Sequence, residues 1–246
     1  MAFVFFRSKR SIPIKVEDYL DDKNRGLYDF VQGRLHLTMR RSTESVYGTN
    51  LIRDEATIYV PAGDPQLASF THELLHAKLW IKRINCSLKL DVSSHSFVQS
   101  ILSDKLCEHI SNIMEHRKMF PEFIAMGYKE DEFLADYQTP ILTSKEVSTI
   151  ISSLKINDQY LAPVIDLFIG KYLSARLCGL SNYDYSKELQ QMREAEPVLT
   201  AYLESFAERW DKFDIEKNDA LADDNCIMIK MDFVEDLDTW ACAYLQ

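Results

Sequence analysis

Two histidines four residues apart are the feature that most constrains this chain. They are His72 and His76, with Glu73 between them, in the segment 66–82. Positions i and i+4 lie on one face of a helix, about one turn apart, so both imidazoles can reach one metal ion. Apolar residues recur with helical spacing on the other side: Leu67, Phe70, Leu74, Ala77 and Ile81. The pattern predicts a helix over 66–82 with an apolar back and a histidine-bearing face on the wall of a cleft.

The run Thr71-His-Glu-Leu-Leu-His-Ala-Lys-Leu resembles the active-site helix of the zincins, a group of zinc-dependent hydrolases that carry H-E-x-x-H. The resemblance implies that His72 and His76 bind Zn²⁺ and that Glu73 takes a proton from a zinc-bound water. A strand predicted over 53–60 and a turn over 61–65 precede the helix, as in that family. In zincins a strand near this helix pairs with extended substrate, and we expect 53–60 to do so here.

A third metal ligand is expected on the next long helix, which the sequence predicts over 94–120. Catalytic zinc usually takes three protein ligands and leaves one position for water. Glutamate-type zincins carry the third ligand on such a helix, so the resemblance implies Glu108 as the third ligand. Asn112, one turn later, would orient a zinc-binding histidine. His116, one turn further on, would donate to the developing oxyanion or serve as the ligand itself.

Two more residues compete with Glu108 as third ligand, besides His116. They are Glu115, which we expect nearer the solvent side of the helix, and His109, nearer its apolar side. The chain has neither the full N-E-x-x-S-D motif nor H-E-x-x-H-x-x-G-x-x-H, because Ala77-Lys-Leu-Trp-Ile-Lys82 follows the second histidine. A metzincin is therefore disfavoured, and the resemblance extends over about residues 35–137.

The rest of the chain predicts a mainly helical α+β fold, with a zincin-like N-terminal half that holds a small sheet and the active-site helix, followed by a helical C-terminal half. Only 7 Gly and 7 Pro among 246 residues favour long helices over many strands. We expect two regions, 1–140 with the metal site and 141–246, which can pack as one domain. The further elements expected are a helix over 16–31, a strand over 33–40, a polar loop over 42–50, helices over 144–155, 158–178, 185–213 and 236–244, and a strand or helix over 226–234. We expect Pro121 to bend or restart the chain after the second long helix, and Pro197 to kink a later one.

Charge and cysteine content narrow the function classes. A formal net charge of −10 argues against nucleic-acid binding and against attraction to a membrane surface. No apolar run approaches the length of a membrane span. The five cysteines are scattered and show no C-x-x-C spacing, which favours reduced thiols in a cytoplasmic protein.

These observations together predict a cytoplasmic, zinc-dependent metallopeptidase that acts on a protein or peptide substrate. Glu73 would serve as general base and then as acid toward the leaving amine. The main alternative is a regulatory or interaction protein that binds a metal on a zincin scaffold with little or no turnover. Hydrolysis of a non-peptide amide is a third possibility. The presence of Glu73 favours an enzyme, because a metal-binding scaffold has no chemical need for it.

Overall fold

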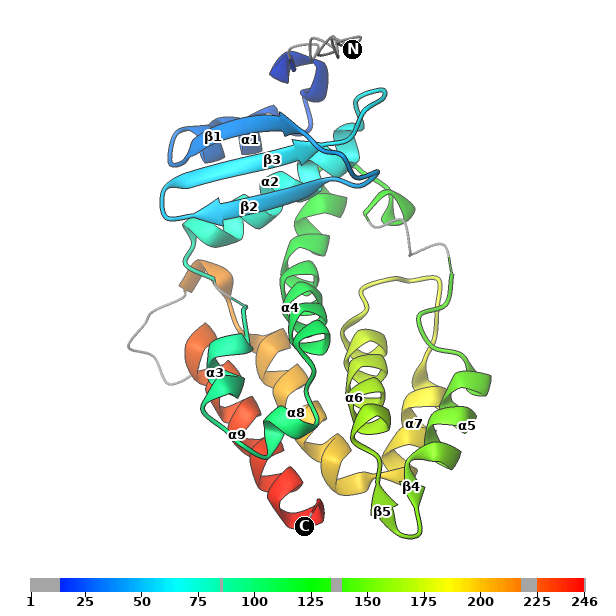
Figure 1. Cartoon of the computed structure of the whole chain (residues 1–246). Helices are drawn as coiled ribbons and strands as arrows, with labels where there is room; N and C mark the ends of the chain where they lie inside the picture. Colours follow the sequence, from blue (N-terminus) through cyan, green and yellow to red (C-terminus); the bar gives the residue numbers. More distant parts are fainter. Residues whose placement is uncertain (1–13, 85, 134–138, 218–224, 246) are drawn as a thin grey trace, which may run out of the picture.

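The computed structural model describes residues 14–84, 86–133, 139–217 and 225–245. Within these ranges, a small sheet near the N-terminus is followed by a chain that is mostly helical, which confirms the mainly helical α+β class. Figure 1 shows the sheet at one end of the molecule and the C-terminal helices at the other. The long helix α4 runs between these two ends.

The sheet has three strands in the order β1-β3-β2, with β1 parallel and β2 antiparallel to the central β3. Their bounds are His36–Arg41 for β1, Gly48–Ile52 for β2 and Glu55–Val60 for β3. Every second residue of β3 is buried, and helix α2 packs against β3 and β2. The alternation follows from the strand period of two, which turns one face of β3 toward the helix.

Two expectations about these strands were wrong. The strand predicted over 53–60 is the central one, so both its edges are paired and it cannot add a substrate strand. The segment predicted as a polar loop, 42–50, overlaps the edge strand β2, in which Gly48 and Asn50 disfavour a strand. Pairing with β3 from Gly48↔Tyr59 to Ile52↔Glu55 fixes its conformation.

The single helix predicted over 16–31 is two elements. A short 3₁₀ helix, η1 (Val16–Tyr19), is followed by α1 (Arg25–Gln32). Between them the side chain of Asp21 accepts hydrogen bonds from the backbone nitrogens of Lys23 and Asn24. Such side-chain bonds compete with helix hydrogen bonding and explain the break.

Helix α2 (Leu67–Ile81) confirms the helix predicted over 66–82. The second long helix begins later than expected, because α3 (Lys89–Ser93) and η2 (Val98–Ser100) come before α4 (Asp104–Ala125). The hydroxyl of Ser103 caps α4 by accepting a hydrogen bond from the backbone nitrogen of Leu106. The second long helix was expected to end at residue 120, before Pro121. This was wrong, because α4 continues through Pro121 to Ala125.

The C-terminal half is built from helices with one small hairpin. Its elements, after η3 (Glu130–Glu132), are α5 (Ser144–Ser153), β4 (Lys155–Ile156), β5 (Gln159–Tyr160), α6 (Ala162–Leu177), α7 (Ser186–Ala195), α8 (Pro197–Lys212), η5 (Ile215–Lys217) and α9 (Cys226–Tyr244). The helix predicted over 185–213 is interrupted at Glu196, and Pro197 occupies the first position of α8. The segment 226–244 is one helix rather than two elements.

Packing between elements places α4 at the junction of the two halves. It contacts α2 toward the sheet and α6 toward the C-terminal helices, while α8 packs against α6 and α9 (Figure 1). In the described ranges, no helix combines the length and the apolar character needed to cross a membrane. The division near residue 140 stays a prediction.

Candidate metal centre

Three histidines from two helices come together where α2 meets α4. His72 and His76 lie on α2 and His116 lies on α4, and one ligand atom from each falls within 4.8 Å of the other two. The Nε2 atoms of His72 and His76 are 3.1 Å apart. The ring centroid of His116 lies 4.9 Å from that of His72 and 5.4 Å from that of His76. This group could hold a metal ion.

Electrostatics favour the neutral form of two of these imidazoles. Burial, with the nearby His76 and His116, holds the pKa of His72 well below its usual range. Burial, with the charge of His76, lowers the pKa of His116 to about 3. A hydrogen bond with the backbone of Phe133 raises the pKa of His72 in part, but burial outweighs it. Metal binding requires a neutral imidazole, so these histidines are ready to act as ligands at neutral pH.

His76 is oriented by a carboxylate on the facing helix. Its Nδ1 donates a hydrogen bond of 2.6 Å to Oε2 of Glu115, which leaves the Nε2 lone pair turned toward His72. Burial lowers the pKa of His76, but the hydrogen bond and charge of Glu115 and the charge of Glu73 outweigh it, and that pKa is raised. A carboxylate bound to the second nitrogen of a ligand histidine fixes the tautomer and increases its basicity.

Glu73 is buried between α2 and the edge strand. Its Oε2 accepts a hydrogen bond of 2.6 Å from the hydroxyl of Thr49 on β2. Burial raises the pKa of Glu73, although His76 and Thr49 lower it in part. A carboxylate with a raised pKa, next to histidines that could hold a metal ion, has the properties of a general base.

Hydrogen bonds on the far side of α2 hold the helix in place. The hydroxyl of Thr71 lies 3.0 Å from Nδ2 of Asn24 and 3.0 Å from the hydroxyl of Tyr128. Farther along α2, Lys78 donates a 2.6 Å hydrogen bond to Glu122 of α4. Together with the bond from His76 to Glu115, this contact fixes α2 and α4 relative to each other at more than one point.

Phe133 covers the histidines. Its ring centroid is 4.7 Å from that of His72 and 5.4 Å from that of His116. His72 and Glu73 are each only 7% exposed, so the centre is screened from bulk water. The expected open cleft wall is thus a largely covered site.

The structure places Glu108, the expected third ligand, away from the three histidines. Glu108 lies on the surface, with a side chain that is 63% exposed and an ion pair of 2.6 Å to Lys89. Eight residues of helix separate it from His116, which means about 12 Å along the axis and a rotation of about 80°. The helix therefore does not bring Glu108 to the three histidines, and His116 is the residue of α4 that lies with His72 and His76.

Three other expected site residues lie elsewhere than predicted. Asn112 is exposed on α4, and the described residues include no hydrogen bond from it to the three histidines. His109 shares the face of His116 but bonds to Ser174 of α6 at 2.8 Å, about two turns away. Glu115, expected nearer the solvent, faces α2 with a side chain that is 22% exposed. Because His116 lies in the group that could hold a metal ion, its position favours the expected ligand role over the role of oxyanion donor.

Sequence reasoning did not single out Thr49 or Phe133. Thr49 lay in a segment predicted as loop, and Phe133 follows a short turn of helix with no pattern that points to a site. Glu115 was considered only as a competing metal ligand. Its contact with His76 could have been expected, since it directly precedes His116 and neighbouring helix positions, 100° apart, can both face a partner helix.

Comparisons of this chain with protein-family models, with curated proteins and with solved structures found no match. The resemblance to zincins therefore rests on the H-E-x-x-H segment and its surroundings.

Proposed function

We propose that this protein is a zinc-dependent metallohydrolase that cleaves peptide bonds. The observation that carries the proposal is the juxtaposition of His72, His76 and His116 with the buried carboxylate of Glu73. Three protein ligands and a neighbouring base are the parts that a metal-assisted hydrolysis needs.

The donor set suits zinc. Two nitrogens bound to one Zn²⁺ at 2.0–2.1 Å in tetrahedral geometry lie about 3.3 Å apart. The Nε2 atoms of His72 and His76 are 3.1 Å apart, close to that separation. Imidazole also accommodates copper, iron and nickel, so metal analysis is part of the test.

Each residue of the centre has a task in this proposal. Zinc, when bound, would lower the pKa of a bound water toward about 7 and polarise the scissile carbonyl. Glu73 takes a proton from the attacking water and delivers it to the leaving amine. Thr49 holds Oε2 of Glu73 in place, and Glu115 holds His76 with its Nε2 turned toward the metal.

One observation favours a second function. The metal group is covered by Phe133, and Glu73 is almost fully buried. A covered centre suits a protein that binds its metal for structure or regulation and turns over little. The two functions differ in whether peptides are hydrolysed, because both require the metal.

The first experiment measures metal content after purification with added zinc. We expect about one zinc per chain in the unmutated protein and in Glu108→Ala, and below a tenth of an equivalent in His72→Ala, His76→Ala and His116→Ala. His109→Ala is the matched control, a histidine on the same face of α4 that bonds to α6 instead. Zinc retained by His116→Ala, or lost from Glu108→Ala, would contradict the ligand set.

The second experiment separates the enzyme from the metal-binding scaffold. Glu73→Gln should keep zinc and the fold but lose hydrolysis of a mixed peptide library, because an amide cannot accept the proton of water at neutral pH. Product peptides are counted by mass spectrometry. If the unmutated, zinc-loaded protein yields no products, the scaffold function stands in place of the peptidase.

We also place the protein in the cytoplasm. The proposal rests on the five cysteines, for which the structure records no disulfide, as expected where thiols stay reduced. Fluorescence microscopy of the tagged chain tests this placement.

A further inference from the structure

A cavity of about 540 Å³ lies beside the metal centre, between α4 and α6. One face of α4 lines it with His109, Asn112, His116 and Arg117, so the cavity begins at a ligand histidine. From His116 to His109 the helix rises about 10 Å. That distance is about three extended residues. A peptide held at the metal could therefore place a nearby group in this cavity.

Among the residues that the structure describes, the charged side chains that line the cavity are cationic. Lys171 and Arg117 belong to this lining, and no described Asp or Glu does. Lys171 extends from α6 and donates to the backbone oxygen of Ile141 at 2.7 Å and to Glu146 at 2.8 Å. An ammonium group has three donors, so one remains for a ligand. The charge of Lys171 is felt inside the cavity, where it adds to burial in lowering the pKa of His109.

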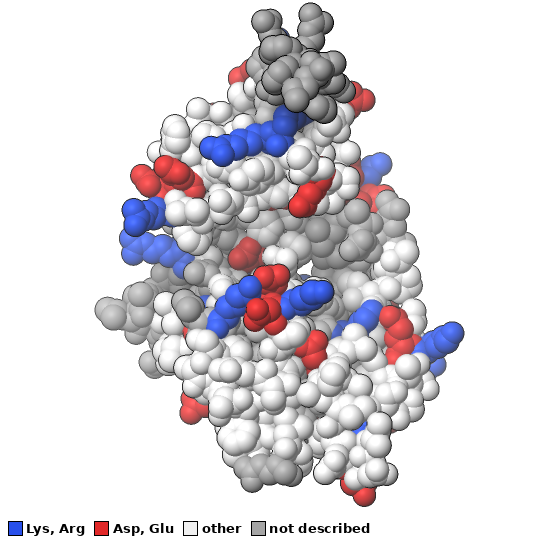
Figure 2. All heavy atoms as spheres, viewed as in Figure 1, with Lys and Arg blue, Asp and Glu red and all other residues white. Residues whose placement is uncertain are grey.

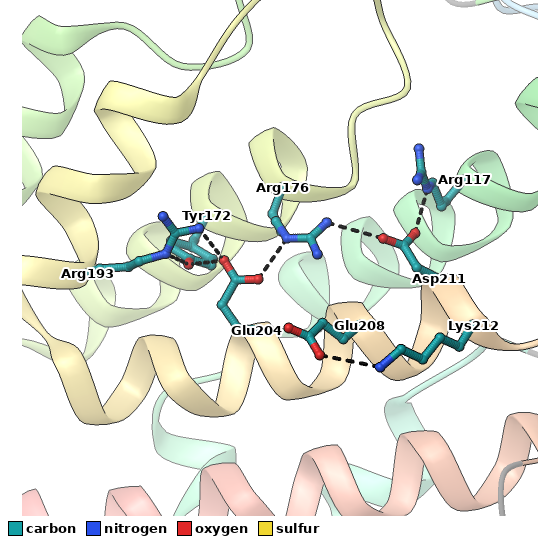
Figure 3. Close-up of polar contacts among 8 residues, drawn as sticks. All are labelled: Arg117, Tyr172, Arg176, Arg193, Glu204, Glu208, Asp211 and Lys212. Carbon is teal, nitrogen blue, oxygen red and sulfur yellow. Dashed lines mark hydrogen bonds and ion pairs between the residues drawn. The ribbon is translucent and has the colours of Figure 1, made fainter.

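Arg117 keeps most of its donors unused. Its Nε donates to Asp211 at 2.7 Å, and the described residues include no hydrogen bond from its terminal nitrogens. Figure 3 shows these nitrogens directed away from Asp211. Asp211 also pairs with Arg176 at 3.2 Å, so two guanidinium groups share its single charge. The positive charge of Arg117 is therefore only partly compensated.

Negative charges elsewhere on the molecule do not cancel the local positive charge of the cavity. Figure 2 shows acidic and basic side chains gathered across the middle of one face, between the sheet and the C-terminal helices. The whole chain carries a formal charge of −10, which repels anions at long range. Screening limits such repulsion to about 10 Å at 0.1 M salt. Recognition of an anion therefore depends on the donors that line the cavity.

We propose that this cavity binds a carboxylate of the peptide substrate, carried by an acidic side chain near the scissile bond or by the C-terminus. Lys171 and Arg117 are the specificity-determining residues, and they bind the carboxylate through charge-assisted hydrogen bonds. The inference depends on the proposed peptidase function for the nature of the ligand. Its test measures binding without catalysis.

The test uses zinc-loaded protein with Glu73→Gln and fluorescent nonapeptides of alanine and leucine. Each peptide carries Glu or Gln at one position and ends in a free acid or an amide, which separates the two sources of the carboxylate. Fluorescence anisotropy gives Kd for every member at 0.15 M salt. We expect at least one Glu peptide, or the free-acid series, to bind about tenfold more tightly than its neutral match.

Substitutions then identify the groups that recognise the charge. Lys171→Met or Arg117→Gln should reduce the acid preference below threefold. Glu146→Gln is the matched control, because it breaks the same ion pair as Lys171→Met but leaves the cation, so it should preserve or strengthen the preference. Lys145→Met removes an exposed positive charge outside the cavity and should change nothing. If Lys171→Met does not fold, the acid preference measured with Arg117→Gln tests the proposal.

The inference is overturned by an acid preference below twofold at every position and at the C-terminus, or by a preference that survives Lys171→Met combined with Arg117→Gln. No measurable binding of any acidic peptide overturns it as well. Hydrolysis of the same peptides by the unmutated chain is measured separately. Cleavage without acid preference contradicts the cavity assignment alone. Acid-selective binding without cleavage contradicts the peptidase proposal alone.

Discussion

At the scale of single residues, the centre depends on how each histidine is held as much as on the histidines themselves. His76 has the carboxylate of Glu115 on its second nitrogen, whereas His72 meets the backbone of Phe133. The three ligands are therefore not equivalent. Glu115 sets the direction in which His76 presents its lone pair.

Glu115→Gln should weaken zinc binding by about tenfold to a hundredfold, as expected when a group that orients a ligand is changed. The matched control is Glu122→Gln, which also breaks a 2.6 Å contact between α4 and α2, the one made to Lys78. Both variants remove a contact between α2 and α4, but only Glu115→Gln changes a residue that bonds to a proposed metal ligand. Zinc affinity measured with a competing chelator distinguishes them. Equal losses would show that Glu115 acts only through the packing of α4 on α2.

The site residues on α2 could be predicted from the sequence, but the residue that α4 contributes could not. His72, Glu73 and His76 follow from spacing within α2, because the positions i and i+4 fix their relative direction. The partner from α4 depends on which turn of that helix crosses α2. That crossing is a tertiary contact, and it selected His116 over Glu108.

At the scale of elements, a network of arginines and carboxylates joins α4, α6, α7 and α8. Glu204 of α8 accepts hydrogen bonds from Arg176 at 2.7 Å, from Arg193 at 2.6 Å and from the hydroxyl of Tyr172 at 2.5 Å (Figure 3). One carboxylate therefore connects three helices. Burial would raise the pKa of Glu204, but these hydrogen bonds and the charge of Arg176 outweigh it, and that pKa is lowered.

Glu204→Gln should reduce the free energy of unfolding by roughly 1.5–3 kcal/mol at pH 7, the range for hydrogen bonds to a charged group. Because the folded-state pKa is lowered, this stabilisation is complete above the unfolded-state pKa of about 4.3 and is lost as the pH falls through the folded-state value. The difference between the two proteins in urea unfolding should therefore shrink below about pH 4.

The control for that measurement is Glu208→Gln on the same helix. Glu208 pairs with Lys212 at 3.5 Å, and the two side chains are 58% and 78% exposed. Exposed pairs of this kind contribute little, so we expect a change below about 0.5 kcal/mol. If Glu204→Gln changes stability no more than Glu208→Gln does, the network does not hold the helices together.

At the scale of the whole molecule, the metal centre joins the sheet-bearing end to the rest through α2 and α4 (Figure 1). A ligand that binds only the folded chain stabilises it by mass action. Zinc that needs ligands from both helices should therefore stabilise the fold as a whole.

Zinc at a hundred times its Kd should stabilise the protein by about 2.7 kcal/mol, which for a chain of this size raises Tm by roughly 5–10 °C. Differential scanning calorimetry with and without a chelator measures the shift. Glu108→Ala should retain the shift, while His116→Ala should show almost none. A shift that persists in His116→Ala would place the stabilising metal elsewhere.

The sequence by itself determined the elements whose signals are local. The helix over 66–82, its paired histidines and the mainly helical class follow from periodicity and composition, which act within a few turns of chain. Only the tertiary structure decided the features that depend on distant neighbours. Strand β2 exists because β3 pairs with it, and Thr49 reaches Glu73 for the same reason. His116 joins the centre because α4 crosses α2 at that turn, a packing choice that the spacing of residues along α4 does not specify.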